Sequence, residues 1–446
     1  MTCFPFFVYR SAWRLLLPPV VVLGGLDRLV RGRIGKGFLP SSWRVTERGD
    51  AGAGDAAGGR PTLWLHCASL GEAKGMWAFA ESLGEPAAMD LLLTATTSDG
   101  AGFLERQCAA VRKQGPGDAR RYRARIAPFD HSAVVRRFLQ RQGIRGLCLY
   151  EVELWPHYLA ACREMRLPVA LICGRLTEKA VRRYRRFGGA GARLLDGLAW
   201  IQAQSPEDAE RFRSVTIAEV APGFDFKAAH YLAQRPAPRN REDSRIRSRA
   251  GDPKQAGSKP RFAFISLHFA ELAMLEPGFP ALMAKFDLMV FPRRMGELGR
   301  FRKVLGPMGF QAHSRNPGAR HLLVDSMGRV VPLLRECRAA FVGGSLIPLG
   351  CHNLWEPLSA GLQIHFGPWF GNQALAGSLL ERGLANILRD PERIGECLPP
   401  GPETRAACEA LAGELRQGLE SALADGGRRI FVTFYPEANV RSAAEA

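Results

Sequence analysis

Residues 63–83 read LWLHCASLGEAKGMWAFAESL, and the fold of the chain can be predicted from the pattern in this stretch. The run LWLHCA is almost wholly apolar, which is typical of a strand buried on both faces. Ser69 and Glu72 then form a helix-start signal, and apolar residues follow at helical spacing. A buried strand that leads directly into a helix predicts one βα unit of a parallel sheet.

The same alternation continues on both sides of a polar interruption. Residues 229–260 are rich in Arg, Pro, Ser and Gly and have almost no apolar periodicity, so we expect a basic linker or insertion there. We therefore predict an α/β protein with one domain at residues 50–228 and a second at residues 261–446, facing a central cleft. The strand-like runs are LWLHCA at 63, LLLTATT at 91, GLCLY at 146, PVALIC at 168, RFAFISL at 261, FDLMVFP at 286, HLLVD at 321, AAFVGGS at 339 and QIHFG at 363.

Charge and an apolar N-terminal segment indicate an anionic surface as a partner. Lys and Arg number 61 against 43 Asp and Glu, a net charge of +18, which attracts anions. No nucleic-acid-binding motif is present, so we expect no nucleic acid partner. The apolar run 15–26 is shorter than the ~20 residues of a spanning helix and is followed by basic residues. We predict that residues 1–49 contain a membrane-associating helix that lies in the interface; a plain core helix is the alternative.

The ten cysteines include no C-x-x-C pair, and several lie within apolar runs. They are typical of small buried side chains in a reducing compartment. No His, Cys and Asp cluster has ligand spacing, so no metal site is predicted.

Glu72 follows the end of a predicted strand and begins a helix, which places it at the cleft. A carboxylate there can act as a general base if burial raises its pKa. Ser69 and Glu72 also fit a capping box, in which Glu72 only accepts a hydrogen bond from the backbone. Spacing alone leaves both interpretations open.

Two further strand ends carry candidate residues. Glu151 and Glu153 follow GLCLY and share one face if the strand continues, so they either position an acceptor or form a solvated edge. In the second half, Gly343 and Gly344 end a strand and allow a ligand to approach the backbone. Asn353 then resembles an N-cap, which predicts a helix start suited to phosphate.

Taken in order, these segments resemble the 3-deoxy-D-manno-octulosonic acid (Kdo) transferase family of lipopolysaccharide synthesis. The resemblance extends from the N-terminal YRSAWRLLLPPVVV segment to about residue 372. Single matches of this kind are common, but the ordered set is specific. The segments are HCASLGE (66–72), TATTSDG (94–100), APFD (127–130), EVELWP (151–156), CGRLTEKAVRRY (173–184) and FVGGSLIPLGCHNLWEP (341–357).

The resemblance implies a GT-B glycosyltransferase with two Rossmann-like domains, CMP-Kdo as donor, a lipid A precursor as acceptor, and no cofactor. It implies an inverting transfer at the cytoplasmic face of the inner membrane. Glu72 matches the general base, and Glu151 and Lys227 match groups that stabilise the transition state. The residues that match the CMP-binding segments are Pro292, Arg293, Met327, Gly328, Arg329, Asn353, Leu354, Trp355 and Glu356.

The sequence departs from the family pattern at several of these positions. Arg329 stands where the family has an acid, and Lys227 lies one position later than the family's lysine in Gly223 to Lys227, GFDFK. SLHFAEL keeps His268 and Glu271 of the corresponding motif but not its small residues. Two alternatives therefore stay open, a GT-B transferase for another nucleotide sugar and a catalytically silent lipid-binding protein.

Overall fold

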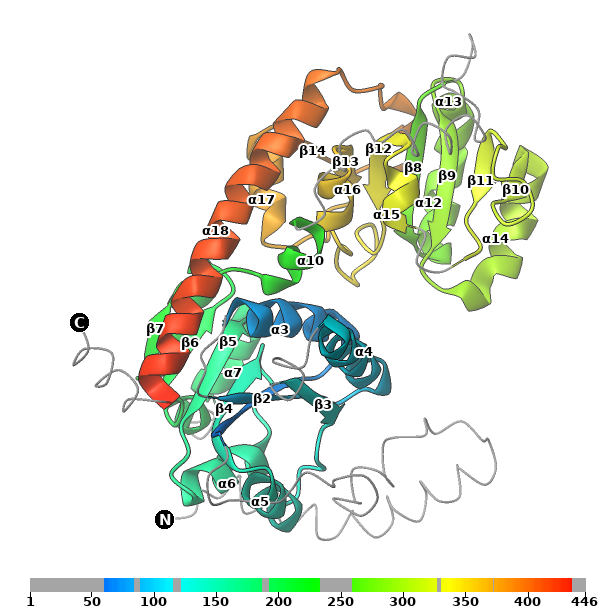
Figure 1. Ribbon diagram of the computed structural model, residues 1–446. Coiled ribbons are helices and arrows are strands. Elements are labelled where there is room, and N and C mark those ends of the chain that lie inside the picture. Colours follow the sequence, from blue (N-terminus) through cyan, green and yellow to red (C-terminus); the bar gives the residue numbers. More distant parts are fainter. Residues whose placement is uncertain are drawn as a thin grey trace. The chain divides into compact units, whose positions relative to one another are not determined.

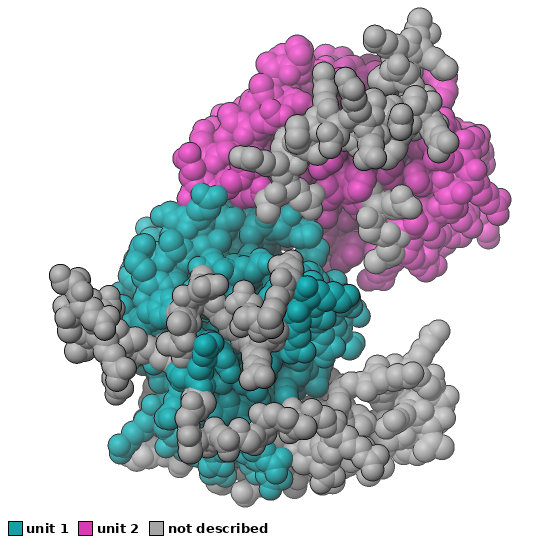
Figure 2. All heavy atoms as spheres, viewed as in Figure 1, with its two compact units in different colours: residues 1–230, 418–446 teal, residues 231–417 magenta. Residues whose placement is uncertain are grey.

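The computed structural model describes residues 60–83, 89–114, 122–186, 192–232, 259–326, 330–371 and 373–434. The chain forms two compact units, coloured separately in Figure 2. Unit 1 comprises residues 1–230 and 418–446, and unit 2 comprises residues 231–417.

Unit 1 is built on a seven-stranded parallel sheet in the order β3-β2-β1-β4-β5-β6-β7 (Figure 1). The strands are β1 (Thr62–Cys67), β2 (Asp90–Ala95), β3 (Tyr122–Ile126), β4 (Ile144–Tyr150), β5 (Val169–Gly174), β6 (Trp200–Ala203) and β7 (Glu219–Ala221). The helices are α3 (Leu70–Ser82), α4 (Ser98–Gln114), α5 (Ser132–Arg141), α6 (Pro156–Glu164), α7 (Glu178–Arg186), α8 (Ala192–Leu195), α9 (Pro206–Arg213), η1 (Phe226–Ala228) and α10 (Ala229–Leu232).

The central strand β1 shows why this sheet forms. All of its residues are buried, because β2 and β4 flank it in the sheet and helices cover both faces. Helix α3 contacts α4, and α5 contacts α6, as expected when the crossovers on either side of β1 run in opposite directions. The strand order reverses between β1 and β4, and their carboxyl ends therefore form the topological switch point where α/β sheets bind ligands.

Unit 2 contains a second seven-stranded parallel sheet, in the order β10-β11-β9-β8-β12-β13-β14. The strands are β8 (Arg261–Leu267), β9 (Asp287–Pro292), β10 (Phe310–Ala312), β11 (His321–Leu323), β12 (Cys337–Val342), β13 (Gln363–Phe366) and β14 (Ala385–Ile387). The helices are α12 (Phe269–Leu275), η2 (Glu276–Gly278), α13 (Phe279–Met283), η3 (Met295–Glu297), α14 (Leu298–Leu305), η4 (Gly306–Met308), α15 (Val330–Leu334), α16 (Trp355–Ser359), α17 (Leu375–Glu381), η5 (Pro391–Glu396) and α18 (Glu403–Phe434). Its switch point lies between β8 and β12.

The prediction of an α/β protein with two Rossmann-like domains is confirmed by these two sheets. The predicted limit of the second domain differs from the structure, because α18 starts in unit 2 and its residues from Gly418 onward belong to unit 1. The ring of Phe434 lies over Gly146 of β4, where an added Cβ would meet it at 1.9 Å. Gln202 of β6 also donates a hydrogen bond to the Ala422 carbonyl at 2.8 Å.

Three predicted features fall wholly or largely outside the described residues. These are the membrane-associating helix within residues 1–49, most of the linker at 229–260, and the segment 327–329. The start of the predicted linker is helical, since α10 covers Ala229–Leu232. In the part of the chain that is described, no helix has both the length and the apolar character needed to cross a bilayer.

Candidate functional site

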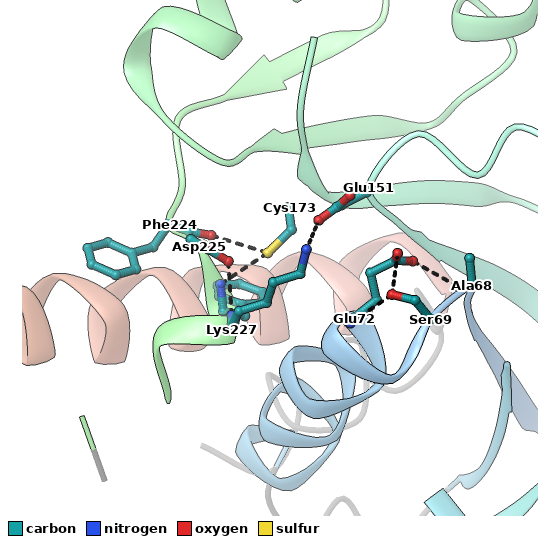
Figure 3. Close-up of polar contacts among 9 residues, drawn as sticks. Ala68, Ser69, Glu72, Glu151, Cys173, Phe224, Asp225 and Lys227 are labelled. Carbon is teal, nitrogen blue, oxygen red and sulfur yellow. Dashed lines mark hydrogen bonds and ion pairs between the residues drawn. The ribbon is translucent and has the colours of Figure 1, made fainter. Parts of the chain in front are cut away.

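Glu72 lies in the first turn of α3, directly after the carboxyl end of β1 at the switch point of unit 1 (Figure 3). Its carboxylate accepts hydrogen bonds from the Ser69 hydroxyl at 2.7 Å and from the Ala68 backbone N–H at 2.8 Å. Ser69 is the N-cap and its hydroxyl accepts from the Glu72 backbone N–H at 3.4 Å. The cap by Ser69 that the sequence suggested is therefore present, but Glu72 accepts from the N–H of Ala68 and not from that of the N-cap residue as in a capping box. These bonds also orient the carboxylate.

The Glu72 carboxylate can accept further hydrogen bonds. An ionised carboxylate has about four lone-pair sites, and two hydrogen bonds are made here. Glu72 is 9% exposed, so it is largely shielded from water but still accessible to solvent. The geometry leaves it able to accept a proton from a bound hydroxyl.

Glu151 follows β4, the neighbour of β1, and forms an ion pair with the Lys227 ammonium group (Figure 3). The backbone of Glu151 is left-handed, with φ 54°, which costs a non-glycine residue roughly 1 kcal/mol. Such strain is kept where the surrounding structure demands it, often at functional sites. Burial by itself would lower the pKa of Lys227, but the charge and hydrogen bond of Glu151, with Asp225 and Glu72, raise it. Lys227 therefore stays a cation.

Lys227 reaches Glu151 because hydrogen bonds and core packing fix the position of the short helix η1. Asp225 caps η1 and accepts from the Lys227 backbone N–H at 3.0 Å. Phe226 points into the core and stacks on Phe79, with ring centroids 5.5 Å apart. Cys173 supports the same turn, since its sulfur accepts from the Phe226 N–H at 3.3 Å and donates to the Phe224 carbonyl at 3.2 Å (Figure 3). Sequence reasoning missed the supporting roles of Asp225 and Cys173.

Glu153 adds a third carboxylate to this region. Its carboxylate accepts from the Trp155 indole N–H at 2.9 Å. Burial, and then the charge of Glu72, raise the pKa of Glu153 to about 6. The buried Cys67 at the end of β1 is influenced by the same groups, because its thiol pKa is raised first by burial and then by Glu72, Glu153 and Glu151. The structure thus brings these predicted acids and Lys227 together at one edge of the unit 1 sheet.

In unit 2 the predicted nucleotide-binding residues lie at the carboxyl ends of β9 and β12. Pro292 ends β9, and the exposed Arg293 follows it, with its backbone N–H bonded to the Leu267 carbonyl at 2.9 Å. Met327, Gly328 and Arg329 lie outside the described residues.

Asn353 is not the N-cap that the sequence predicted, because Leu354 is the N-cap of α16, a helix of only five residues. The Asn353 side chain accepts from the Trp355 backbone N–H at 2.9 Å, so this N–H of the short helix α16 already has a partner. Leu354 and Trp355 are buried and pack inward, whereas Glu356 is half-buried. Asn353 therefore shapes the loop. The preceding glycine loop does not offer the open backbone that the sequence predicted, because Gly343 and Gly344 are buried and their N–H groups bond to the Ile265 carbonyl and the Glu271 carboxylate.

Among the described residues, no group of three or more His, Cys, Asp or Glu side chains is arranged to hold a metal ion. The chemical groups that the structure does assemble are carboxylates and a lysine in unit 1, and arginines, histidines and a glycine loop in unit 2.

Two parallel sheets of Rossmann order, with candidate acids at the switch point of one and a glycine loop at that of the other, define the GT-B class of glycosyltransferases. The crystal structure of Glycyrrhiza uralensis UGT73P12 complexed with glycyrrhetinic acid 3-O-monoglucuronide has a similar fold. Its TM-score is 0.55 at 10% identity, over 86% of this chain and 98% of that one.

Sequence comparison narrows the class to a family. The family model described as 3-deoxy-D-manno-octulosonic-acid transferase (kdotransferase) matches residues 43–228. The 3-deoxy-D-manno-octulosonic acid transferase of Bordetella pertussis is 29% identical over 336 residues, 72% of this chain and 74% of that protein. The transferase of the same name from Chlamydia muridarum is 23% identical over 367 residues, 80% of this chain and 81% of that protein. Residues 43–228 therefore match the Kdo transferase family, and the chain is similar to transferases of that name over 72% and 80% of its length.

Proposed function

We propose that this protein transfers Kdo from CMP-Kdo to a lipid A precursor, with inversion at the anomeric carbon, in lipopolysaccharide synthesis. The observation that carries the proposal is the placement of Glu72 beside the Glu151–Lys227 ion pair at the switch point of unit 1. The relatives from Bordetella pertussis and Chlamydia muridarum bear the name of this activity.

Glu72 acts as the general base in the proposed reaction. It removes the proton from an acceptor hydroxyl, whose oxygen forms a bond to the anomeric carbon. The bond between that carbon and the phosphate oxygen breaks on the opposite face, and its electron pair leaves with CMP. The hydrogen bonds from Ser69 and Ala68 hold the carboxylate in one orientation, which favours attack from a single direction.

Glu151 and Lys227 supply fixed charge in this mechanism. As the bond to CMP breaks, positive charge develops at the sugar ring, and the carboxylate of Glu151 stabilises it. Lys227 orients the Glu151 carboxylate through their ion pair. It also provides a cation for a sugar that carries its own carboxylate.

The donor nucleotide belongs to unit 2 in this proposal. Arg293, the segment 327–329, and Asn353 to Glu356 hold CMP, and the exposed Arg293 pairs with its phosphate. No cofactor takes part. The basic N-terminal segment, residues 1–49, holds the protein on the cytoplasmic face of the inner membrane, where the lipid acceptor lies.

Purified protein incubated with CMP-Kdo and a lipid A precursor tests the activity. We expect wild-type transfer, and a loss of roughly 10²-fold or more in kcat for Glu72→Gln, since general-base catalysis is worth about that much. Glu105→Gln, an exposed acid on α4 of the same unit, is the matched control and should keep full activity.

The outcomes separate the alternatives. Transfer that survives in Glu72→Gln rejects the mechanism, and no transfer by wild type rejects the activity. Competition by UDP or ADP in preference to CMP would indicate a transferase for another nucleotide sugar. Binding of lipid vesicles without binding of any nucleotide would indicate a silent lipid-binding protein. Deletion of residues 1–49 should abolish sedimentation with anionic vesicles if that segment is the membrane anchor.

A further inference from the structure

Two histidines from distant parts of unit 2 are hydrogen-bonded to each other. The Nε2 atoms of His268 and His352 lie 2.8 Å apart, and the rings are nearly parallel at a centroid distance of 5.1 Å. A neutral imidazole has one N–H, so one of these nitrogens donates and the other accepts. In the neutral pair, one Nδ1 then carries a proton and the other is an acceptor. The two rings behave as one unit that can hold one further proton.

The backbone around the pair is fixed by a buried carboxylate. Glu271 is fully buried and accepts from the backbone N–H groups of Gly344 at 2.7 Å, Leu346 at 3.0 Å and His268 at 3.2 Å. Gly344 has φ 79°, and a Cβ added there would lie 3.0 Å from the His352 ring. The contact between the rings thus follows from the loop geometry and not from free side-chain rotation.

The surroundings of the pair are positively charged. Arg293 and Arg294 follow β9, and Arg300 of α14 lies near them with its hydrogen bond to Glu297 at 3.4 Å. A cavity of about 270 Å³ beside His268 is lined in part by Arg294, Glu297 and Arg300. Among the described residues, the charged groups near the pair are Arg293, whose charge acts on His352, and Arg294, Glu297 and Arg300, which line the cavity beside His268. The buried Glu271 carboxylate also lies close, bonded to the backbone N–H groups.

Burial and this positive charge both disfavour a proton on His352 when no anion is bound. Burial, and then the charges of Arg293 and His268, lower the pKa of His352 to about 4. A bound phosphate brings negative charge to the same place and offsets the arginines. Protonation of the pair then becomes favourable, so that phosphate binding and proton binding are linked.

We propose that His268 and His352 form a proton-sharing pair that contacts the phosphate of the donor nucleotide and takes up one proton from solvent when that phosphate binds. The inference rests on the proposed function in that the ligand is a nucleotide donor. When the bond from the sugar carbon to the phosphate oxygen breaks, the leaving nucleotide gains one negative charge. The protonated pair meets this charge with N–H donors, and it returns its proton to solvent when the nucleotide departs.

Titration calorimetry of the full chain with CMP tests this proposal. The binding enthalpy is measured at pH 7 in buffers of different ionisation enthalpy, and its dependence on the buffer gives the number of protons taken up. The methyl ester of CMP, a phosphodiester whose charge is constant near neutrality, is titrated in parallel so that proton uptake cannot come from the ligand. We expect proton uptake with both ligands. The Kd of the ester should rise by about two- to tenfold for each pH unit above 6.

Variants locate the proton. His352→Gln and His268→Gln keep a hydrogen-bonding side chain, and each should abolish proton uptake and flatten the pH dependence of ester binding. His313→Gln, elsewhere in unit 2, should leave both unchanged. If the two variants fail to fold, the wild-type measurement still decides whether a proton is taken up.

The results distinguish this inference from the proposed function. If CMP and its ester bind without proton uptake, the proposed protonation of the histidine pair is wrong, whereas CMP remains supported as the donor nucleotide. Proton-linked binding of UDP in place of CMP supports the pair and rejects CMP as the donor nucleotide. Binding of no nucleotide at all rejects both.

Discussion

Lys227 departs from the family pattern in its sequence position, and its side chain pairs with Glu151. The family motif has its lysine one position earlier, where this chain has Phe226. Phe226 is fully buried against Phe79, and this inward anchor turns the next side chain toward Glu151. Spacing along the motif is therefore less informative than the direction in which the turn presents each side chain.

Replacing Lys227 with Met is expected to lower kcat roughly 10²-fold, because Glu151 loses its counter-charge and the donor loses a preorganised cation. Lys227→Arg should retain part of the activity. Steady-state transfer kinetics check this, with Lys113→Met on the exposed side of α4 as the control. Activity of Lys227→Met within twofold of wild type would contradict the assigned role.

Glu153 provides a prediction about pH and stability. Its pKa is raised to about 6 in the folded protein, above its ordinary value of 4.5. The folded state therefore binds more protons than the unfolded state between these values, and stability falls as the pH rises from about 4.5 to 6. Glu153→Gln should remove this loss and be more stable than wild type above pH 6 by about 1 kcal/mol, after discounting for solvent screening.

Denaturant unfolding at pH 4.5 and pH 7 measures this difference. Glu164→Gln, an exposed acid on α6, is the control and should not change the pH dependence by a similar amount. A Glu153→Gln variant that parallels wild type at both pH values would show that burial does not perturb this group.

At the scale of elements, α3 is the helix whose position matters most for the site. It carries Glu72, and it packs so closely against β4 that a Cβ on Gly75 would lie 2.2 Å from the Tyr150 hydroxyl oxygen. Gly71, in the same helix, has no heavy atom closer than 4.0 Å to the equivalent position. Two glycines in one helix thus have opposite packing environments.

Gly75→Ala is expected to destabilise the protein by about 1–3 kcal/mol, because overpacking forces α3 away from β4. It should also reduce transfer activity, since Glu72 moves with the helix. Gly71→Ala is the matched change and should raise stability by about 0.5 kcal/mol through helix propensity. Thermal unfolding and activity assays of the two variants check both statements; equal effects would refute the packing argument.

At the scale of the whole molecule, α18 is shared between the two units. It begins in unit 2 at Glu403, and its final residues belong to unit 1, where the helix is drawn in red in Figure 1. Phe434 is 7% exposed and lies over Gly146, while Arg429 forms an ion pair with Glu219 of β7. The integrity of unit 1 therefore depends on residues from the far end of the chain.

Phe434→Ala is expected to destabilise unit 1 by about 3–5 kcal/mol, as for truncation of other buried aromatic side chains. Unfolding of the full chain should show an earlier transition for unit 1, while unit 2 is little changed, because two-domain proteins need not unfold in one step. Val432→Ala, whose side chain is 58% exposed on the same helix, should change stability by less than about 0.5 kcal/mol. A similar loss in both variants would contradict this assignment.

Much of the fold was predictable because hydrophobic periodicity is a local property. Long buried runs such as LWLHCA and RFAFISL predicted the central strands, and the polar stretch 229–260 separated the two sheets. Five of the strands that the structure describes were not predicted. β6, β7, β10 and β14 have only three or four residues, too few to show a periodicity, and β3 (YRARI) contains two arginines.

The sequence by itself predicted the class of fold, the resemblance to the Kdo transferase family, and Glu72, Glu151 and Lys227 as candidate site residues. Only the tertiary structure decided that Phe434 packs on β4, and that His268 meets His352 from 84 residues away. The physical reason is that local pattern records which residues prefer burial, whereas contacts between distant residues depend on the path of the chain. That path is set by the packing of whole elements, which no short stretch of sequence contains.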